Sequence, residues 1–155
     1  MVQSEQPLFI PSRITIPFNY AAGAIASRFF VELRDHRKIL GRRCPQCTRV
    51  LVPPRKFCLH CFTPTSEWVE VESTGTLVNF TVVQKTETHH PRKAPFAYGV
   101  IQLDGADTNL VHLLGEINLH HIRQGSRVRA VFNEKRVGNI LDIAYFKPED
   151  SESPG

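Results

Sequence analysis

The spacing of apolar residues changes along the chain from a helical to an alternating pattern. In residues 21–38, apolar side chains recur at four-residue intervals at Ile25, Phe29 and Leu33, and charged residues occupy much of the remaining surface. This spacing predicts an amphipathic helix that ends before Gly41. Its apolar stripe has two interpretations, packing on the helix's own domain or docking to a partner subunit.

The residues before this helix predict an extended arm. Pro7, Pro11 and Pro17 exclude a regular helix there. We expect the arm and the helix together to form the surface that docks to a partner. The candidate docking residues are Tyr20, Ile25, Phe29, Phe30 and Leu33.

After four cysteines, the periodicity falls to two, which predicts strands. The candidate strands are Gly75–Val83, Phe96–Leu103, Asn109–Leu114, Arg127–Phe132 and Ile140–Phe146. Asp104-Gly105 predicts a tight turn between the second and third strands. Residues 115–125 predict a short helix or 3₁₀ turn that ends at Gly125. Three strands, a helical segment and two strands are the chain order of an OB-type barrel.

The predicted fold is therefore mainly β. With 155 residues, 41% of them hydrophobic, the chain can form one compact unit with an added metal module. The expected order is an extended arm and amphipathic helix (1–40), a Cys₄ zinc ribbon (41–66), a five-stranded OB-fold barrel (67–147) and a disordered tail (148–155).

The four cysteines have the spacing of a metal site. Cys44 and Cys47 form one C-x-x-C pair, and Cys58 and Cys61 form the other. Each pair can chelate an ion from a tight turn, and the ten residues between the pairs allow a short hairpin that brings them together. We expect a structural zinc ion, which cannot activate water because four thiolates leave no open coordination position.

Iron is the alternative metal, because rubredoxin also uses four thiolates. Rubredoxin-type knuckles commonly have a small residue, often Gly, after the second cysteine of each pair. Thr48 and Phe62 occupy those positions here. We therefore favour structural zinc over an iron electron carrier.

The net charge of +4 is unevenly distributed. Residues 1–63 contain 10 Lys and Arg against 3 Asp and Glu, whereas residues 64–155 contain 9 against 12. Part of the basic excess balances the four thiolates. A single-stranded nucleic-acid-binding module is the alternative function, with Phe80, Tyr98 and Phe132 among the aromatic candidates, but the acidic barrel half makes nucleic acid a poor partner.

No catalytic constellation is present in the sequence. It has no G-x-S-x-G, P-loop, G-x-G-x-x-G or H-E-x-x-H motif, and every cysteine belongs to the metal site. We therefore expect no catalysis by this chain alone.

The segment 84–95 is the one candidate for contact with an anion. Its cations are Lys85, His89, His90, Arg92 and Lys93. Two prolines restrict the segment, so it can present these cations to a phosphate or a carboxylate. A solvated polar loop is the other interpretation.

No run of about 18 apolar residues predicts a membrane span, and the N-terminus lacks a basic region followed by an apolar core. We expect a cytoplasmic protein with reduced cysteines and no membrane contact.

In this order of elements the chain resembles the DUF35 family of acyl-CoA-associated proteins, which have a rubredoxin-like zinc ribbon and an OB-fold. The matching segments are FFVELRDHRKILGRRCPQC (29–47), VLVPPRKFCLHC (50–61), WVEVESTGTLVNFTVV (68–83), FAYGVIQLDG (96–105), LLGE (113–116) and IRQGSRVRAVF (122–132). The two prolines after an apolar run and the W-x-x-x-x-x-x-G-x-L entry to the barrel make the resemblance specific.

The resemblance implies an accessory role. Family members are small non-catalytic subunits of thiolase-like enzymes, such as archaeal acetoacetyl-CoA thiolase assemblies, benzoylsuccinyl-CoA thiolase and the phloroglucinol acetyltransferase complex; others accompany steroid-side-chain enzymes. The reactive residues then belong to the thiolase-like partner. This chain would scaffold the complex and help to enclose a CoA thioester at the shared interface.

Overall fold

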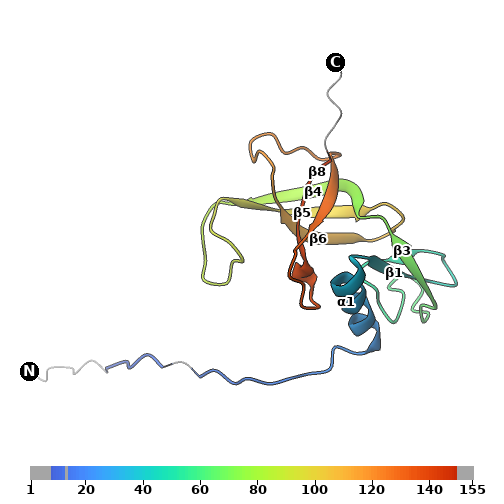
Figure 1. The fold of residues 1–155 in the computed structure, drawn as a ribbon, viewed down its shortest axis with the longest axis horizontal. Coiled ribbons are helices and arrows are strands. Elements are labelled where there is room, and N and C mark those ends of the chain that lie inside the picture. Colours follow the sequence, from blue (N-terminus) through green and yellow to red (C-terminus); the bar gives the residue numbers. More distant parts are fainter. Residues whose placement is uncertain (1–7, 13, 150–155) are drawn as a thin grey trace, which may run out of the picture.

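The computed structural model describes residues 8–12 and 14–149. Its elements are α1 (Ala24–His36), β1 (Ile39–Arg43), β2 (Val50–Leu51), β3 (Glu67–Val71), β4 (Thr74–Val83), β5 (Phe96–Leu103), β6 (Asn109–Leu114), β7 (Arg127–Phe132), η1 (Ile140–Asp142) and β8 (Ile143–Pro148). The fold is mainly β with one α-helix in the described residues, as predicted (Figure 1).

The residues that precede α1 form neither helix nor strand. We call residues 8–12 and 14–20 the arm, and it runs away from the rest of the molecule (Figure 1). Residues 1–7, which complete the predicted arm, lie outside the described residues, as do residues 150–155 of the predicted tail.

The helix α1 packs on its own chain. Phe29 and Leu33 are 2% and 0% exposed and belong to the main core. The helix ends where Arg37 adopts a left-handed conformation, with φ 59°, and the backbone N–H of Lys38 donates to the carbonyl of Glu32 at 3.2 Å. At Phe29 and Leu33, therefore, the apolar stripe packs on the helix's own domain, the first of the two interpretations.

The segment around the cysteines contains a three-stranded sheet in the order β2-β1-β3. We call residues 39–71 the ribbon. Strand β1 lies between its neighbours and is antiparallel to both. Gly41 is required at the centre of β1, because a Cβ there would lie 2.6 Å from the side chain of Val50.

The remaining five strands close into a barrel in the order β4-β5-β6-β8-β7. All barrel pairs are antiparallel except β6 and β8, which meet in parallel at Leu114 and Phe146. This is the strand order of an OB-type barrel. The buried interior is continuous with Phe29 and Leu33 of α1, and its barrel members include Leu77, Ile101, Leu103, Leu114, Val128, Ile143 and Phe146.

Residues 115–125 form turns, which excludes the short helix of the prediction and leaves its alternative, a 3₁₀ turn. Ile117, Leu119 and Ile122 face the core, and this spacing does not fit one face of a helix. The segment has one turn in which His121 donates to the carbonyl of Asn118 at 2.9 Å.

The last strand begins at Ile143, so the prediction of a strand from Ile140 was wrong for its first three residues. Those residues form the 3₁₀ helix η1, because the side chains of Asn139 and Asp142 form a capping box at its N-terminal end. The side chain of Asn139 accepts from the N–H of Leu141 at 2.7 Å, and Asp142 accepts from the N–H of Gly138 at 2.8 Å.

Strand β3 pairs with β1 and not with a barrel strand. The segment that opens our predicted OB-fold is therefore the third strand of the ribbon sheet. Trp68 on β3 lies beneath two guanidinium groups, those of Arg28 and Arg42, whose central carbons are 4.7 and 4.9 Å from the ring centroid. These contacts join α1, β1 and β3.

The connection between β5 and β6 ties the barrel to the ribbon. The carboxylate of Asp107 accepts from the N–H of Val50 at 2.8 Å. The hydroxyl of Thr108 accepts from the N–H of Val52 at 2.7 Å and donates to its carbonyl at 2.8 Å. Two barrel side chains thus satisfy the free edge of β2, as a neighbouring strand would.

Among the described residues, no helix has the length and apolar character needed to cross a membrane.

Candidate functional site

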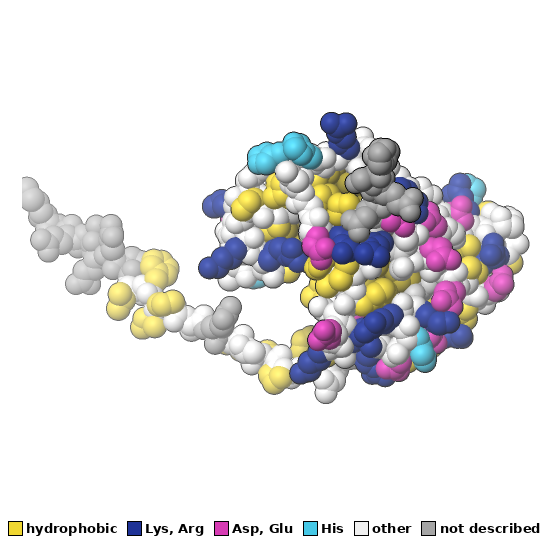
Figure 2. All heavy atoms as spheres, turned by 45° about the horizontal axis from the view of Figure 1, so that its top comes forward, with side chains coloured by type: hydrophobic (Ala, Val, Ile, Leu, Met, Phe, Trp, Pro, Cys, Tyr) yellow, Lys and Arg dark blue, Asp and Glu magenta, His cyan; other side chains and the backbone are white. Residues whose placement is uncertain are grey.

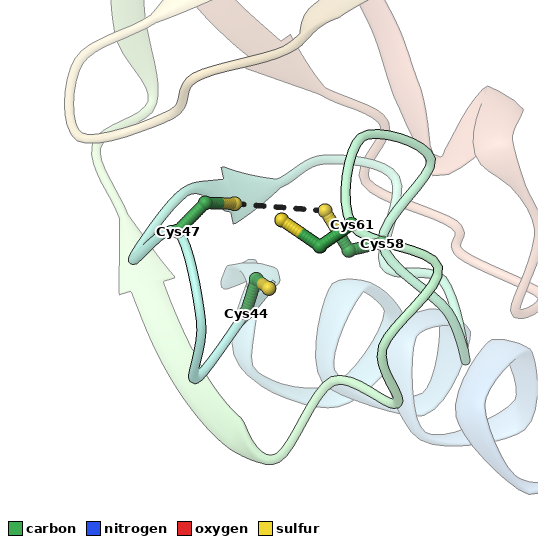
Figure 3. A group of neighbouring side chains, drawn as sticks. All are labelled: Cys44, Cys47, Cys58 and Cys61. Atoms are coloured by element: carbon green, nitrogen blue, oxygen red, sulfur yellow. Dashed lines mark hydrogen bonds between the residues drawn. The ribbon is translucent and has the colours of Figure 1, made fainter.

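The four predicted metal ligands meet at the end of the ribbon. The sulfur atoms of Cys44, Cys47, Cys58 and Cys61 all lie within 4.8 Å of one another, and the side chains converge on one point (Figure 3). Cys44 and Cys58 are buried, whereas Cys47 and Cys61 are partly exposed. The Sγ atoms of Cys47 and Cys58 are 3.6 Å apart.

Both C-x-x-C pairs have the same backbone hydrogen bonds. In the first knuckle, Thr48 donates to the carbonyl of Cys44 at 3.0 Å, and Cys44 donates to the carbonyl of Arg49 at 2.9 Å. In the second knuckle, Phe62 donates to the carbonyl of Cys58 at 2.9 Å. The N–H of Cys58 likewise donates to the carbonyl of Thr63, the residue after Phe62, at 2.9 Å. Two equivalent turns therefore present the two pairs of sulfur atoms to each other.

The position after the second cysteine of each pair has a left-handed backbone. Thr48 has φ 60° and Phe62 has φ 57°. Glycine adopts this conformation without a steric penalty, which is why a small residue is common there in rubredoxin-type knuckles. The substitution by threonine and phenylalanine leaves the turn intact and places the side chain of Phe62 in solvent, 80% exposed.

The donor set fits a tetrahedral metal ion. Zinc–sulfur bonds of about 2.3 Å imply sulfur–sulfur separations of roughly 3.8 Å in a regular tetrahedron. The separations in the cluster, all within 4.8 Å, need only a small contraction to reach that value. Four sulfur ligands leave no coordination position for water or substrate. The site can hold a metal and stabilise the ribbon, and it has no place for chemistry on a substrate.

The pKa values of the two cysteines in the second knuckle are shifted in opposite directions. Backbone N–H groups of Cys61 and His60 lower the pKa of Cys58 to about 7. Burial and the neighbouring sulfur atoms raise the pKa of Cys61 to about 12. Donation from backbone N–H groups favours the thiolate, which is the form that binds a metal.

Arg42 connects the metal cluster to the sheet. Its guanidinium donates to the hydroxyl of Thr65 at 2.7 Å and to the carbonyl of Ser66 at 3.1 Å. Thr65, 6% exposed, in turn donates to the carbonyl of Arg55 at 2.6 Å. This network holds the segment after the second knuckle against β1.

The cations of the 84–95 loop are not gathered into one site. Lys85 pairs with Glu87 at 3.2 Å in solvent. The ring of His90 packs edge-on against Phe96, and its Nδ1 accepts from the N–H of Glu87 at 3.1 Å. Arg92 lies 6.0 Å above the ring of Tyr145. His89 and Lys93 are exposed.

The candidate docking residues divide into two groups. Phe29 and Leu33 are buried in the core and cannot contact a partner while the fold is intact. Ile25 and Phe30 are partly exposed, and Tyr20, on the arm, is 81% exposed. The aromatic candidates for base stacking are also largely committed, since Phe80 and Phe132 pack against the barrel core.

Two functional features escaped sequence reasoning. The ties from Asp107 and Thr108 to β2 have no local sequence signal, because the partners are more than 50 residues apart. The second is the strand-like pattern of the arm, whose apolar side chains are exposed. Its alternation is visible in the sequence and could have been found by testing for period two.

Two family models match adjacent parts of the chain. Residues 31–67 match the rubredoxin-like zinc ribbon domain of ChsH2, and residues 68–133 match the C-terminal OB-fold domain of ChsH2. Among curated proteins, a DUF35 domain-containing scaffold protein from Methanocaldococcus jannaschii is 25% identical over 126 residues, which cover 78% of this chain and 89% of that protein.

Two solved structures have a similar fold. One is a chain of the Ltp2-ChsH2(DUF35) aldolase, with a TM-score of 0.62 and 24% identity over 84% of this chain and 98% of that chain. The other is a DUF35 protein of unknown function from Sulfolobus solfataricus, with a TM-score of 0.58 and 22% identity over 70% of this chain and 78% of that chain.

Proposed function

This chain belongs to the DUF35 family, whose members pair a rubredoxin-like zinc ribbon with an OB-fold, and on that premise we propose that it is a non-catalytic scaffold subunit of a thiolase-like acyl-CoA enzyme. The relative from Methanocaldococcus jannaschii is itself described as a scaffold protein. A similar fold is found in a chain of the Ltp2-ChsH2(DUF35) aldolase, whose name joins Ltp2 and ChsH2.

The observation that carries this proposal is the contrast between the metal site and the arm. The metal site is a closed cluster of four sulfur atoms with no place for substrate. The arm, in contrast, presents exposed apolar side chains at several places along its length (Figure 2), namely Leu8, Phe9, Ile10, Ile14, Ile16, Phe18 and Tyr20, each at least 73% exposed. Exposed apolar surface of this extent is typical of a protein-binding site.

The metal in this proposal is zinc, in a structural role. It would hold the two knuckles together through Cys44, Cys47, Cys58 and Cys61. Purified protein should then be colourless and contain one zinc ion per chain by elemental analysis. A red protein with stoichiometric iron would contradict this assignment and favour an electron carrier.

The 84–95 loop is the part of the proposal that concerns CoA. Its cations are not gathered into one site, so the exposed His89, Arg92 and Lys93 would each contact a phosphate group of the CoA thioester separately at the shared interface. Changing Arg92 and Lys93 together to alanine should raise the KM of the assembled enzyme for its thioester. The control is Lys135→Ala, since Lys135 is an exposed cation on a different loop.

Co-expression with a thiolase-like subunit from the same genome tests the scaffold role. The two chains should co-elute with a fixed stoichiometry, and thiolase activity should depend on the presence of this chain. This chain assayed alone should neither cleave nor form the thioester. A thiolase that is fully active by itself, and that never co-elutes with this chain, would refute the proposal.

A further inference from the structure

The arm has the side-chain pattern of a β-strand although it pairs with nothing in the described part of the chain. From residue 14 to residue 20, apolar side chains occupy every even position, as Ile14, Ile16, Phe18 and Tyr20. All four are between 73% and 85% exposed. Successive side chains of an extended chain point to opposite faces, so these four share one face.

The aromatic pair of the arm follows this arrangement. The rings of Phe18 and Tyr20, two residues apart, have centroids 6.1 Å from each other. Leu8 and Ile10 have the same parity and lie nearer the N-terminus, beyond the polar Ser12. At odd positions, Thr15 and Asn19 are polar, whereas Phe9 is apolar and exposed.

The prolines of the arm also follow the alternation. In a strand, the N–H and C=O of one residue point to the same edge, and those of the next residue point to the other edge. Pro11 and Pro17 are both at odd positions, so the N–H groups that they lack all belong to one edge. The other edge keeps its donors, including those of Ile14, Ile16 and Phe18. The arm can therefore pair fully along one edge only.

From these observations we propose that the arm adds as an edge strand to a sheet of the partner enzyme, with its even-numbered side chains in an apolar groove. This inference rests on the proposed scaffold function and specifies how the partner is held. Main-chain hydrogen bonds would supply affinity, and pockets for alternate side chains would supply specificity.

The free strand edges in the described part of this chain are shorter than the arm. Ile14–Tyr20 spans seven residues. Among the strands described, the longest edge without a strand partner belongs to the outer part of β4, from Val78 to Val83, which is six residues, and β3 is only five residues long. The strands of a second copy of this chain offer the same short edges. A different protein with a longer free strand fits the arm better.

The size and charge of the arm predict the area and the polarity of the partner surface that it would cover. An aromatic side chain buries roughly 150–250 Å² when it is fully enclosed, and a stable interface buries about 800 Å² on each partner. The six exposed apolar side chains at even positions of the arm suffice for an interface of that size. No even position from residue 8 to residue 20 is charged, and Arg13 is at an odd position, so the groove on the partner should be apolar instead of acidic or basic.

Three variants of the full chain separate the contribution of the main-chain hydrogen bonds of the arm from that of its apolar side chains. Ile16→Pro removes an N–H from the intact edge and also removes the apolar side chain. Ile16→Ala removes the side chain alone. Thr15→Pro places the proline on the edge that Pro11 and Pro17 already interrupt, and it removes no apolar group.

Affinity would be measured with the thiolase-like subunit obtained by co-expression. We expect Ile16→Pro to raise the Kd about tenfold beyond Ile16→Ala, because a ladder hydrogen bond is lost, and Thr15→Pro to change it less than about twofold. In the complex of the unaltered chain, the amides of Ile14, Ile16 and Phe18 should become protected from hydrogen exchange. Those of Thr15 and Asn19 should continue to exchange.

Each outcome that contradicts the proposal identifies a different part of it as wrong. Equal effects of Thr15→Pro and Ile16→Pro, or equal protection at odd and even positions, would overturn the strand arrangement while leaving the scaffold function in place. Protection of the arm in the isolated chain, together with a dimer mass in light scattering, would assign the arm to a second copy. Protection on lipid vesicles alone would assign it to a membrane. Absence of any complex would refute the scaffold function itself.

Discussion

The ribbon and the barrel of this chain are stabilised by different means. The barrel closes on itself and encloses a core of large side chains such as Leu77, Ile101 and Phe146, each fully buried. At the knuckles of the ribbon, the buried cluster consists of Cys44, Leu51 and Cys58. Such a small cluster cannot offset the conformational entropy of ordering two loops. Metal binding must supply most of the stability at the knuckles.

The comparison also shows how the two regions depend on each other. The inner part of the ribbon, with Ile39, Leu40 and Val52, belongs to the same core as the barrel. The barrel in turn supplies Asp107 and Thr108 to the edge of β2. The ribbon sheet therefore has a rigid base on the barrel, and only its outer end relies on the metal.

Removal of the metal should have the largest effect. Structural zinc sites contribute about 10 kcal/mol or more of apparent binding free energy. After chelation at neutral pH, the amides of Cys44, Thr48 and Phe62, which are bonded within the knuckles, should lose their protection from hydrogen exchange. Barrel amides such as that of Leu77 should stay protected, and added zinc should restore the knuckles. Knuckles that remain protected without metal would contradict the comparison.

A cavity in the barrel should lower the stability of the barrel and leave the knuckles of the ribbon unchanged. Phe146 is fully buried and lies edge-on to the ring of His112, 5.8 Å between centroids. Phe146→Ala should lower the free energy of unfolding in urea by about 3–5 kcal/mol. Phe146→Leu, which leaves a smaller cavity, serves as the matched control. The zinc content of folded protein should be unchanged in both variants, and a loss of zinc would show that the regions are more closely coupled than we infer.

Cutting the tie between the regions should have a smaller effect. Thr108→Val keeps the shape of the side chain but leaves the N–H and C=O of Val52, which is 2% exposed, without their partner. We expect a loss of about 1–3 kcal/mol in the free energy of unfolding. Thr108→Ser keeps the hydroxyl and should lose much less. Equal losses for Ser and Val would mean that the methyl group, and not the hydrogen bonds, holds β2.

The ion pair of Asp104 and Arg127 should have the smallest effect. Arg127 donates to Asp104 at 2.8 Å, and Thr74 donates at 2.6 Å. These bonds, led by that of Arg127, lower the pKa of Asp104 from 3.8 to about 2. Because the pKa is lowered in the folded state, the stabilisation is present above pH 3.8 and is lost as the pH falls towards 2.

Asp104→Asn measures this contribution. Both side chains of the pair are partly exposed, 39% for Asp104 and 45% for Arg127, so solvent screening limits the effect to less than about 1 kcal/mol at neutral pH. The difference in unfolding free energy between the variant and the unaltered chain should shrink between pH 4 and pH 2. A difference that is constant over that interval would mean that the carboxylate charge is not what stabilises the turn.

Much of the fold was predictable because its signals are local. The four-residue spacing of Ile25, Phe29 and Leu33 predicted α1, and period-two segments predicted β4 to β7. The strand order of the barrel followed from recognising an OB-type sequence of elements. The predictions were less accurate where a local capping pattern or a distant partner decides the structure. Capping by Asn139 and Asp142 turns the expected start of β8 into η1, and pairing with β1 places β3 in the ribbon sheet.

The candidate sites show the same division. The two C-x-x-C pairs predicted the metal cluster, because chelation from a tight turn depends on residues three apart. For the 84–95 loop, composition alone suggested a group of cations. In the folded chain Lys85 pairs with Glu87, His90 contacts Phe96 and Arg92 lies over Tyr145, and these neighbours are decided by how the loop lies on the barrel.

By itself, the sequence determined the four-cysteine cluster, the helix and most of the strands, because each depends on residues close together along the chain. The alternation of the arm, although not predicted, is a local pattern of the same kind. Only the tertiary structure decided which apolar residues remain exposed. Phe29 and Leu33 of the helix stripe face the core, whereas Ile16 and Phe18 of the arm are open to solvent. The physical reason is that burial depends on what packs against a residue, and those partners come from distant parts of the chain or from another protein.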